Sequence, residues 1–298
     1  MAARTAWFLN LDADVELAAI ASGAAGARTA YAPKRGVVEA MRAFVPIAAR
    51  SLLDPEEDLL VAEDAPPLSA RGLVGRAFCP TPRALRMLAR AGATIEPHPD
   101  VDVLCRVNAR AFASALGTTL PGAAFVTDLE SARAMLATSP DAALADTWRV
   151  KRNYGMTGRG QRLVTPSALS EPELAFVRAG LGEGGVQIEP NVRIAAEYAI
   201  HGLLDARGDV RLGPVVKQRC DAQGAWIGTE PLAPEDAPSA LVPEAHRVAG
   251  ALAAAGYFGP FGVDAYTYRE RSEPHAAHLQ PRSEINARYT MGFAAPRR

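Results

Sequence analysis

The hydrophobic pattern changes partway along this chain of 298 residues, and this change constrains the possible folds more than any other feature. In the first 106 residues, short apolar runs alternate with stretches of helical periodicity; Ala6–Leu11, for example, precedes a predicted helix at Val15–Ala25. Val101–Val107 continues the series as another predicted buried strand. Because parallel strands are joined by helical crossovers, this alternation predicts an α/β domain.

After residue 106, predicted strands dominate. Thr147–Lys151 and Gln161–Thr165, for example, enclose a glycine-rich loop. Consecutive strands that are joined by short connections pair antiparallel. The predicted fold class is therefore α/β and α+β, with an α/β domain at residues 1–106 followed by a part with mainly antiparallel strand pairs.

The charge balance argues against two classes of partner. The chain has 32 basic and 33 acidic residues, which gives a formal net charge of −1. There is therefore no electrostatic case for binding nucleic acid or an anionic membrane surface, and no apolar run is long enough to span a bilayer. Three widely spaced cysteines without a Cys-x-x-Cys pair favour a reducing cytoplasm over a disulfide-forming compartment.

Lysine is scarce in this chain, since only Lys34, Lys151 and Lys217 occur among the 32 basic residues. Lys151 precedes the segment 154–160, in which three of seven residues are glycine. Glycine lets backbone N–H groups approach an anion closely, so one interpretation is a strand–loop–strand flap that covers phosphates. The other interpretation is a hairpin loop with solvated charges, because an isolated glycine-rich loop is a weak signal.

A group of polar residues near the C-terminal end is more specific. Glu284 and Asn286 lie two residues apart in a predicted strand, so they face the same side. A hairpin centred on Pro274 places Asp264 opposite Glu284, and Gly262 opposite Asn286. Two opposing carboxylates are unfavourable without a cation, and hard oxygen ligands suit Mg²⁺ that is bound together with phosphates. A polar outer face of the strand pair is the alternative interpretation.

Three further polar residues stand out. Asp12 and Asp14 follow the first predicted strand, at the place where α/β domains present ligand-binding residues. Capping of the helix that follows explains these aspartates equally well. His201 lies inside an apolar strand, and we expect it to be a hydrogen-bonded residue of the core or its rim.

Taken in order, these segments resemble the ATP-grasp superfamily of carboxylate–amine ligases, which includes D-alanine–D-alanine ligase and glutathione synthetase. The resemblance runs from about residue 107 to the C-terminus. It implies that 107–185 form the N-lobe of an ATP-grasp domain, that 186–298 form its C-lobe, and that 1–106 form the α/β domain that precedes it. The residues that carry it are Lys151 with its glycine-rich loop, Gln187-Ile188-Glu189-Pro190, Glu197, Lys217, Asp264 and Glu284–Arg288.

The resemblance implies an ATP-binding site that both lobes share. Lys151 would contact the α- and β-phosphates, and Lys217 would reach the phosphates from the other lobe. Arg110 stands where the family has its first lysine, and its planar guanidinium binds phosphate with a different geometry. The phosphates would be covered by Tyr154, Gly155, Gly158 and Gly160, the adenine bound by Gln187, Ile188 and Glu189, and the ribose held by Glu197.

The resemblance also implies the chemical groups of the reaction. Lys151, Lys217 and Arg288 are the implied catalytic residues, and Arg288 would steady the transferred phosphoryl group or the substrate carboxylate. The implied partners are ATP, a small-molecule carboxylate and an amine acceptor, in a cytoplasmic enzyme that is compatible with a homodimer. The implied ligands of Mg²⁺ or Mn²⁺ are Asp264, Glu284 and Asn286.

The implied reaction is an ATP-dependent ligation. A carboxylate oxygen attacks the γ-phosphate, and an amine, or a thiol, then displaces phosphate from the resulting acyl phosphate. Two alternatives remain open from the sequence: a phosphotransferase that acts on a hydroxyl substrate, and a nucleotide-binding protein without catalytic activity. The chain ends soon after Arg288, so we expect it to lack a C-terminal segment that closes the acceptor side in the family.

Overall fold

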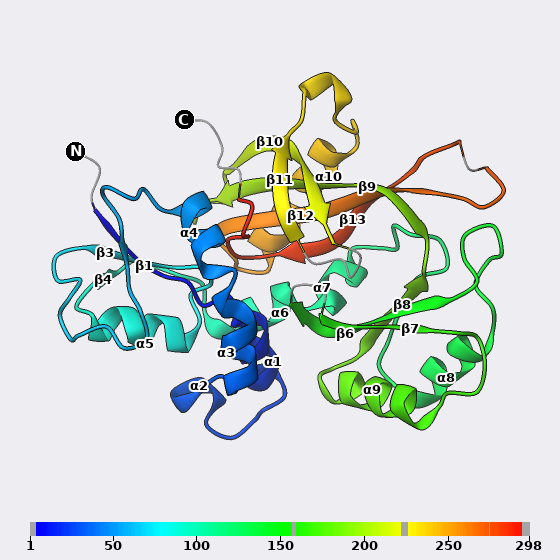
Figure 1. The fold of residues 1–298 in the computed structure, drawn as a ribbon, viewed down its shortest axis with the longest axis horizontal. Coiled ribbons are helices and arrows are strands. Elements are labelled where there is room, and N and C mark those ends of the chain that lie inside the picture. Colours follow the sequence, from blue (N-terminus) through cyan, green and yellow to red (C-terminus); the bar gives the residue numbers. More distant parts are fainter. Residues whose placement is uncertain (1–3, 157–158, 222–225, 274, 294–298) are drawn as a thin grey trace.

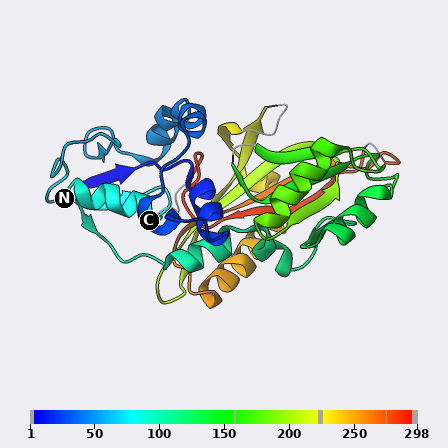
Figure 2. The ribbon, with the colours of Figure 1, turned by 90° about the horizontal axis from the view of Figure 1, so that it is seen from below.

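The computed structural model describes residues 4–156, 159–221, 226–273 and 275–293. Three sheets, which follow one another along the chain, make up the fold (Figure 1). Seen from below, the first sheet and its helices lie to one side of the other two sheets (Figure 2). No helix in the described part of the chain is long and apolar enough to cross a membrane.

The first sheet is parallel where its pairing is defined, as the sequence predicts. Its strand order is β2-β1-β3-β4, and both β2 and β3 pair parallel with β1. A buried Thr81 caps the helix that crosses over from β3, accepting a hydrogen bond from the Ala84 amide at 3.5 Å. The elements are β1 (Thr5–Phe8), β2 (Leu59–Leu60), β3 (Val74–Ala77), β4 (Thr94–Ile95), α1 (Ala13–Ala21), α2 (Ala27–Ala30), α3 (Arg35–Arg42), α4 (Val45–Leu52) and α5 (Pro82–Arg90).

The predicted strand at Val101–Val107 is wrong, because this segment forms helix α6 (Val101–Asn108). Leu104, Cys105, Val107 and Asn108 are its buried residues, and this spacing matches one face of a helix. Periodicity alone does not separate a short apolar helix from a buried strand, which is why the sequence was misleading here. A second short helix, α7 (Arg110–Ala115), follows at once.

The second sheet has the order β5-β8-β6-β7 and is antiparallel throughout. Asp128 caps the N-terminus of α8, as predicted, by accepting a hydrogen bond from the Ser131 amide at 2.8 Å. Strand β8 belongs to this sheet, which therefore extends to Pro190, past the division expected at residue 185. The elements are β5 (Ala124–Val126), α8 (Leu129–Ala137), β6 (Trp148–Met156), β7 (Arg159–Val164), α9 (Glu171–Gly182) and β8 (Val186–Pro190).

The third sheet is antiparallel, with the order β11-β10-β9-β12-β13. The predicted pairs of its last hairpin are confirmed, since Asp264 pairs with Glu284 and Gly262 with Asn286, but the register shifts between Asp264 and Tyr266, so Tyr266 pairs with Gln280. Helix α10 (Leu241–Ala254) packs against one face, and Gly256 follows it with a φ of +82°, which favours glycine. The strands are β9 (Arg193–Leu204), β10 (Val210–Cys220), β11 (Trp226–Pro231), β12 (Gly259–Arg269) and β13 (His278–Asn286), and a 3₁₀ turn lies at Pro234–Asp236.

The two faces of the third sheet have opposite character. Ile200, Val263 and Ile285 lie in register and join the core cluster that contains α10. Because successive residues of a strand point to opposite faces, Asp264 and Glu284 lie on the face away from α10. The second sheet lies opposite this polar face of the third sheet.

His201 is a hydrogen-bonded residue of the core, as predicted, and it gives the protein a pH-dependent stability. Its side chain is 1% exposed, and Nε2 lies 2.9 Å from the Thr290 hydroxyl oxygen. Burial lowers the pKa of His201 to about 4 from its ordinary value of 6.5. The folded protein therefore keeps a neutral imidazole over a pH range in which the unfolded chain takes up a proton.

We expect this group to contribute its full stabilisation above about pH 6.5 and to lose it progressively as the pH falls toward 4. The loss amounts to up to about 3 kcal/mol of unfolding free energy. Urea unfolding of the wild type and of His201→Gln at several pH values measures it. Equal pH dependence in both proteins would contradict the assignment.

Candidate active site

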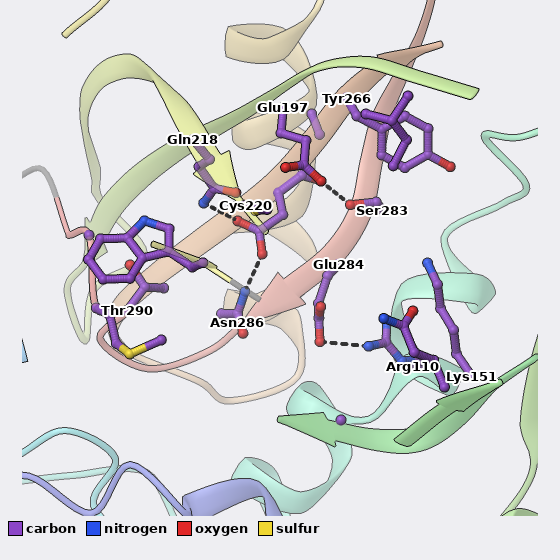
Figure 3. Close-up of a pocket in the computed structure, with 18 of the residues that line it drawn as sticks. Arg110, Lys151, Glu197, Gln218, Cys220, Tyr266, Ser283, Glu284, Asn286 and Thr290 are labelled. Atoms are coloured by element: carbon purple, nitrogen blue, oxygen red, sulfur yellow. Dashed lines mark hydrogen bonds and ion pairs between the residues drawn. The ribbon is translucent and has the colours of Figure 1, made fainter. Parts of the chain in front are cut away.

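A cavity of about 490 Å³ is lined by residues from all three sheets or their connections. One wall comes from the polar face of the third sheet, and the facing wall comes from β6 and β8 of the second (Figure 3). The end of β1, the end of β3 and the N-terminal turn of α1 complete it. The lining residues include Asp14, Phe78, Arg110, Arg149, Lys151, Glu189, Gln218, Asp264, Glu284, Asn286 and Arg288.

The wall from the third sheet carries two carboxylates and two amides. Asp264 Oδ1 accepts a hydrogen bond from Gln218 Nε2 at 3.0 Å, and Oδ2 accepts one from Asn286 Nδ2 at 2.9 Å (Figure 3). Burial, together with the nearby negative charge of Glu284, raises the pKa of Asp264 to about 7. A cation bound beside Asp264 and Glu284 would therefore favour the ionised form of the Asp264 carboxylate.

The facing wall carries basic groups that are already paired with carboxylates. Lys151 Nζ lies 2.5 Å from Glu189 Oε1, and burial lowers the pKa of this lysine while Glu189 partly offsets the effect. Arg110 Nη2 donates to Glu284 Oε1 at 3.0 Å, and its Nε donates to the Arg152 carbonyl oxygen at 3.1 Å. Arg110 thus bridges the second sheet and the carboxylate wall of the third.

A third basic group enters from just beyond β13. Arg288 Nη2 lies 2.6 Å from Asp14 Oδ2, and its guanidinium lies 5.5 Å from the centre of the Phe78 ring. Asp14 belongs to α1 and Phe78 follows β3, so the first domain contributes both contacts. Burial raises the pKa of Asp14, and the positive charge of Arg288 opposes that rise.

Most of the residues that the sequence singled out lie around this one cavity. Their distribution over two facing walls follows from the two-residue period of β6, β8, β9, β12 and β13. Glu197 joins them from β9 and lines the same cavity. The predicted site residues that line the cavity are Arg110, Lys151, Gly155, Glu189, Glu197, Asp264, Glu284, Asn286 and Arg288.

Several other predicted site residues lie outside the lining of this cavity. Ile188 is fully buried in the core between the second sheet and its helices. Tyr154 is also buried, and its hydroxyl donates to the Cys105 carbonyl oxygen at 2.9 Å, so it anchors the start of the glycine-rich loop to α6. Gln187 lines a neighbouring cavity of about 350 Å³. Gly160 has a φ of +80°, which explains glycine by backbone conformation, and Gly158 lies outside the described residues.

Lys217 does not face the cavity, contrary to the role that the resemblance implied. On β10 it is exposed and pairs with Tyr198, whereas its neighbour Gln218 pairs with Glu197 and bonds Asp264. Neighbouring residues of a strand point to opposite faces, so only one of these two side chains can reach the site. In the structure, the side chain that reaches the site is that of Gln218.

We therefore expect Lys217→Ala to leave catalysis and stability nearly unchanged. The side chain is exposed, so its removal shifts the unfolding free energy by no more than about 0.5 kcal/mol. Nucleotide affinity by calorimetry, with Lys217→Ala beside the wild type, measures the effect. A tenfold loss of affinity would instead place Lys217 in the site.

Sequence reasoning missed several polar residues that line the cavity, among them Gln218 and Arg149. Gln218 lies two residues after Val216, on the same face of β10, but Val215 is buried as well, so the pattern did not distinguish Gln218 from Lys217. Arg149 lies two residues before Lys151 on the same face of β6. Its guanidinium donates to Gln161 Oε1 at 2.9 Å and to Asn191 Oδ1 at 2.7 Å.

No protein-family model and no curated protein matches this chain. Solved structures do: N5-carboxyaminoimidazole synthetase from Staphylococcus aureus, complexed with ADP, has a TM-score of 0.51 and 12% identity, covering 97% of this chain and 71% of that chain. N5-carboxyaminoimidazole ribonucleotide synthetase from Thermus thermophilus has a TM-score of 0.49 and 21% identity, covering 96% and 71%. D-Alanine–D-alanine ligase from Helicobacter pylori has a TM-score of 0.40 and 15% identity, covering 69% and 58%. The expected ATP-grasp fold is confirmed by the first of these.

Proposed function

We propose that this chain, which has the ATP-grasp fold, is an ATP-dependent ligase that activates a small-molecule carboxylate for attack by an amine. The observation that carries the proposal is the pairing of two walls across one cavity. Asp264, Glu284 and Asn286 present oxygen ligands on one side, and Lys151 and Arg110 present cations on the other. A nucleotide triphosphate with its divalent cation needs both kinds of group.

The charge of the cavity supports a metal-bound nucleotide. Among the described residues, six carboxylates and four basic side chains line it, so their formal charge is −2. ATP is itself an anion, and it therefore needs a cation that neutralises the carboxylate wall. In the described part of the chain, no group of three or more His, Cys, Asp and Glu side chains could hold a metal ion. We therefore assign the metal to two carboxylates and one amide oxygen, together with phosphate oxygens.

The donor set fits Mg²⁺ or Mn²⁺. Asp264 and Glu284 pair directly across two strands, and such like-charged neighbours are unfavourable until a cation joins them. The Asn286 amide donates its N–H to Asp264, which leaves its carbonyl oxygen available as a ligand. When bound, the metal would neutralise negative charge on the phosphates and orient them.

In the proposed first step, an oxygen of the substrate carboxylate attacks the γ-phosphorus of ATP. A bond forms between that oxygen and phosphorus, and the bond to the bridging oxygen breaks, so that ADP leaves and an acyl phosphate remains. Lys151 would bind phosphate oxygens, and Arg288 would stabilise charge on the transferred group or hold the substrate carboxylate. Burial lowers the pKa of Lys151, and the ion pair with Glu189 opposes this effect and so favours the charged ammonium.

In the second step, the amine nitrogen attacks the acyl carbon. The carbon–oxygen bond to phosphate breaks, inorganic phosphate leaves with the bonding electrons, and the nitrogen loses a proton to give an amide. In both steps the protein positions the reactants and neutralises their charge, and no covalent intermediate forms on the protein. Exclusion of water from the cavity would protect the acyl phosphate.

A panel of carboxylates and amines, assayed for ADP release with mass spectrometry of the products, tests this function. Hydroxylamine in place of the amine should trap a hydroxamate, because only an acyl phosphate reacts in this way. ADP release with a phosphorylated hydroxyl product and no hydroxamate would identify a phosphotransferase instead. Tight ATP binding without ADP release across the panel would identify a nucleotide-binding protein without catalytic activity.

A further inference from the structure

We propose that Asp14 is a positioning residue that aims Arg288 into the cavity and keeps it away from the metal-binding carboxylates. This inference rests on the proposed function, in which Arg288 contacts the reacting groups. It adds a residue of the first domain to the reaction centre. The two residues lie 274 positions apart in the chain.

The contact between Asp14 and Arg288 is a two-point ion pair. Arg288 Nη2 donates to Asp14 Oδ2 at 2.6 Å, and Nε donates to Oδ1 at 3.3 Å. Both side chains are largely buried, with 12% of Arg288 and 7% of Asp14 exposed. A planar guanidinium that is held through two nitrogens by one carboxylate has a defined orientation, whereas a single contact would let it rotate.

Two further contacts complete the support of Arg288. The guanidinium lies 5.5 Å from the centre of the Phe78 ring, and Phe78 is itself only 4% exposed. Arg288 Nη1 donates to the Tyr289 carbonyl oxygen at 3.3 Å. A guanidinium has five N–H donors, and these contacts use three. As far as residues 4–293 are described, one N–H on Nη1 and one on Nη2 remain for a ligand in the cavity.

Among the described residues, the ion pairs of the cavity keep Arg288 and the metal-binding Glu284 with different partners. Glu284 pairs with Arg110, whereas Arg288 pairs with Asp14. The contact with Asp14 therefore holds the Arg288 guanidinium apart from the carboxylate wall.

Helix capping, the other interpretation of these aspartates, does not account for the contacts. The N-cap residue of α1 is Asp12, and its side chain makes no capping hydrogen bond. Asp12 instead pairs with Arg83, next to Glu16, in the first domain. The two aspartates are therefore both buried and both paired with an arginine, but only Asp14 lines the cavity.

This similarity makes Asp12→Asn a matched control for Asp14→Asn. Both changes keep the side-chain shape and remove one carboxylate from a buried ion pair in the same turn. With a carboxylate and amine pair that releases ADP, we expect Asp14→Asn to lower kcat by about 10- to 100-fold, since misplaced reacting groups cost that much. The KM for ATP should change less than about threefold, because Lys151 and the metal site are untouched. Asp12→Asn should change neither constant by more than about threefold at a temperature where both variants are folded.

An NMR experiment tests the orientation of the Arg288 side chain and needs no substrate. In ¹⁵N-arginine-labelled protein, the Nε–H resonance of Arg288, assigned by its loss in Arg288→Lys, should be ordered and slow to exchange in the wild type and in Asp12→Asn. In Asp14→Asn we expect it to broaden or to exchange at least tenfold faster. If Asp14→Asn is poorly folded, Phe78→Leu removes the other support from the first domain and should give a smaller shift in the same direction.

An unchanged Arg288 resonance in Asp14→Asn would overturn the inference, whatever the activity. Equal losses of kcat in Asp14→Asn and Asp12→Asn would also overturn it, because they would show a general effect on the first domain. Absence of ADP release by the wild type would remove the proposed function, while the resonance would still decide whether Asp14 holds Arg288. The two failures are therefore distinguishable.

Discussion

Lys151→Met should abolish ADP release while the protein still folds. Methionine keeps a flexible stem of similar length but removes the ammonium that we assign to the phosphates. Lys151 is the one lysine among the cavity-lining residues in the described part of the chain, so no neighbouring lysine can replace it. Loss of a single preorganised charge contact to a reacting group lowers kcat by on the order of 10²- to 10³-fold.

The same change also has a cost in stability, which must be separated from the effect on catalysis. Glu189 is 3% exposed in its side chain and would be left as an unpaired buried carboxylate, an arrangement that costs about 3–5 kcal/mol. We therefore expect Lys151→Met to melt at a lower temperature than the wild type. The double variant Lys151→Met/Glu189→Gln should recover most of the stability but none of the activity.

ADP release, measured beside thermal unfolding for the wild type and both variants, distinguishes these effects. Activity that returns together with stability in the double variant would show that Lys151 only neutralises Glu189. Wild-type turnover in Lys151→Met alone would remove Lys151 from the reaction and, with it, the assignment of the facing wall to the phosphates.

Glu284→Gln should also strongly reduce ADP release, through weaker binding of the metal. Glutamine has almost the same shape as glutamate, but it removes one of the two charges that hold the cation. Metal-ion catalysis supplies several kcal/mol of transition-state stabilisation, so we expect a loss on the order of 10²-fold or more. Arg110 loses its ionic partner at the same time, and its guanidinium becomes free to bind phosphate.

The dependence on Mg²⁺ separates this explanation from a loss of folding. Glu284→Gln should need a much higher Mg²⁺ concentration for its residual activity, and its melting temperature should change little because Glu284 is partly exposed. Glu273→Gln, in the exposed hairpin between β12 and β13, removes the same charge away from the site and should behave as the wild type. An unchanged Mg²⁺ requirement in Glu284→Gln would contradict the proposed metal ligands.

Local sequence patterns were sufficient for the parts of the site that lie within one hairpin. The spacing of Glu284 and Asn286, together with a turn predicted at Pro274, correctly predicted the pairing of Asp264 with Glu284 and of Gly262 with Asn286. A strand has a period of two, and its pairing partner lies only about 20 residues away, so short-range geometry determines which side chains meet. The same reasoning placed Lys151 on a strand that leads into a glycine-rich loop.

Local patterns were insufficient where the orientation of a side chain, or the type of an element, depended on packing against another helix or sheet. From the sequence, either Lys217 or Gln218 could face the cavity. In the structure, one face of the third sheet packs against α10, and Gln218 lies on the opposite face, where it contacts Asp264. Val101–Val107 has too few residues to distinguish a helix from a strand by period, and packing against α1 decided for a helix.

The sequence by itself therefore determined the change from a parallel sheet to antiparallel sheets, the pairing of Asp264 with Glu284 and the chemical nature of the carboxylate wall. Tertiary structure alone decided which basic groups face that wall and how they are held. Arg110 meets Glu284 across 174 residues, and Asp14 meets Arg288 across 274. The physical reason is that hydrophobic periodicity encodes which face of an element is buried, whereas ion pairs between distant elements depend on how the three sheets pack together.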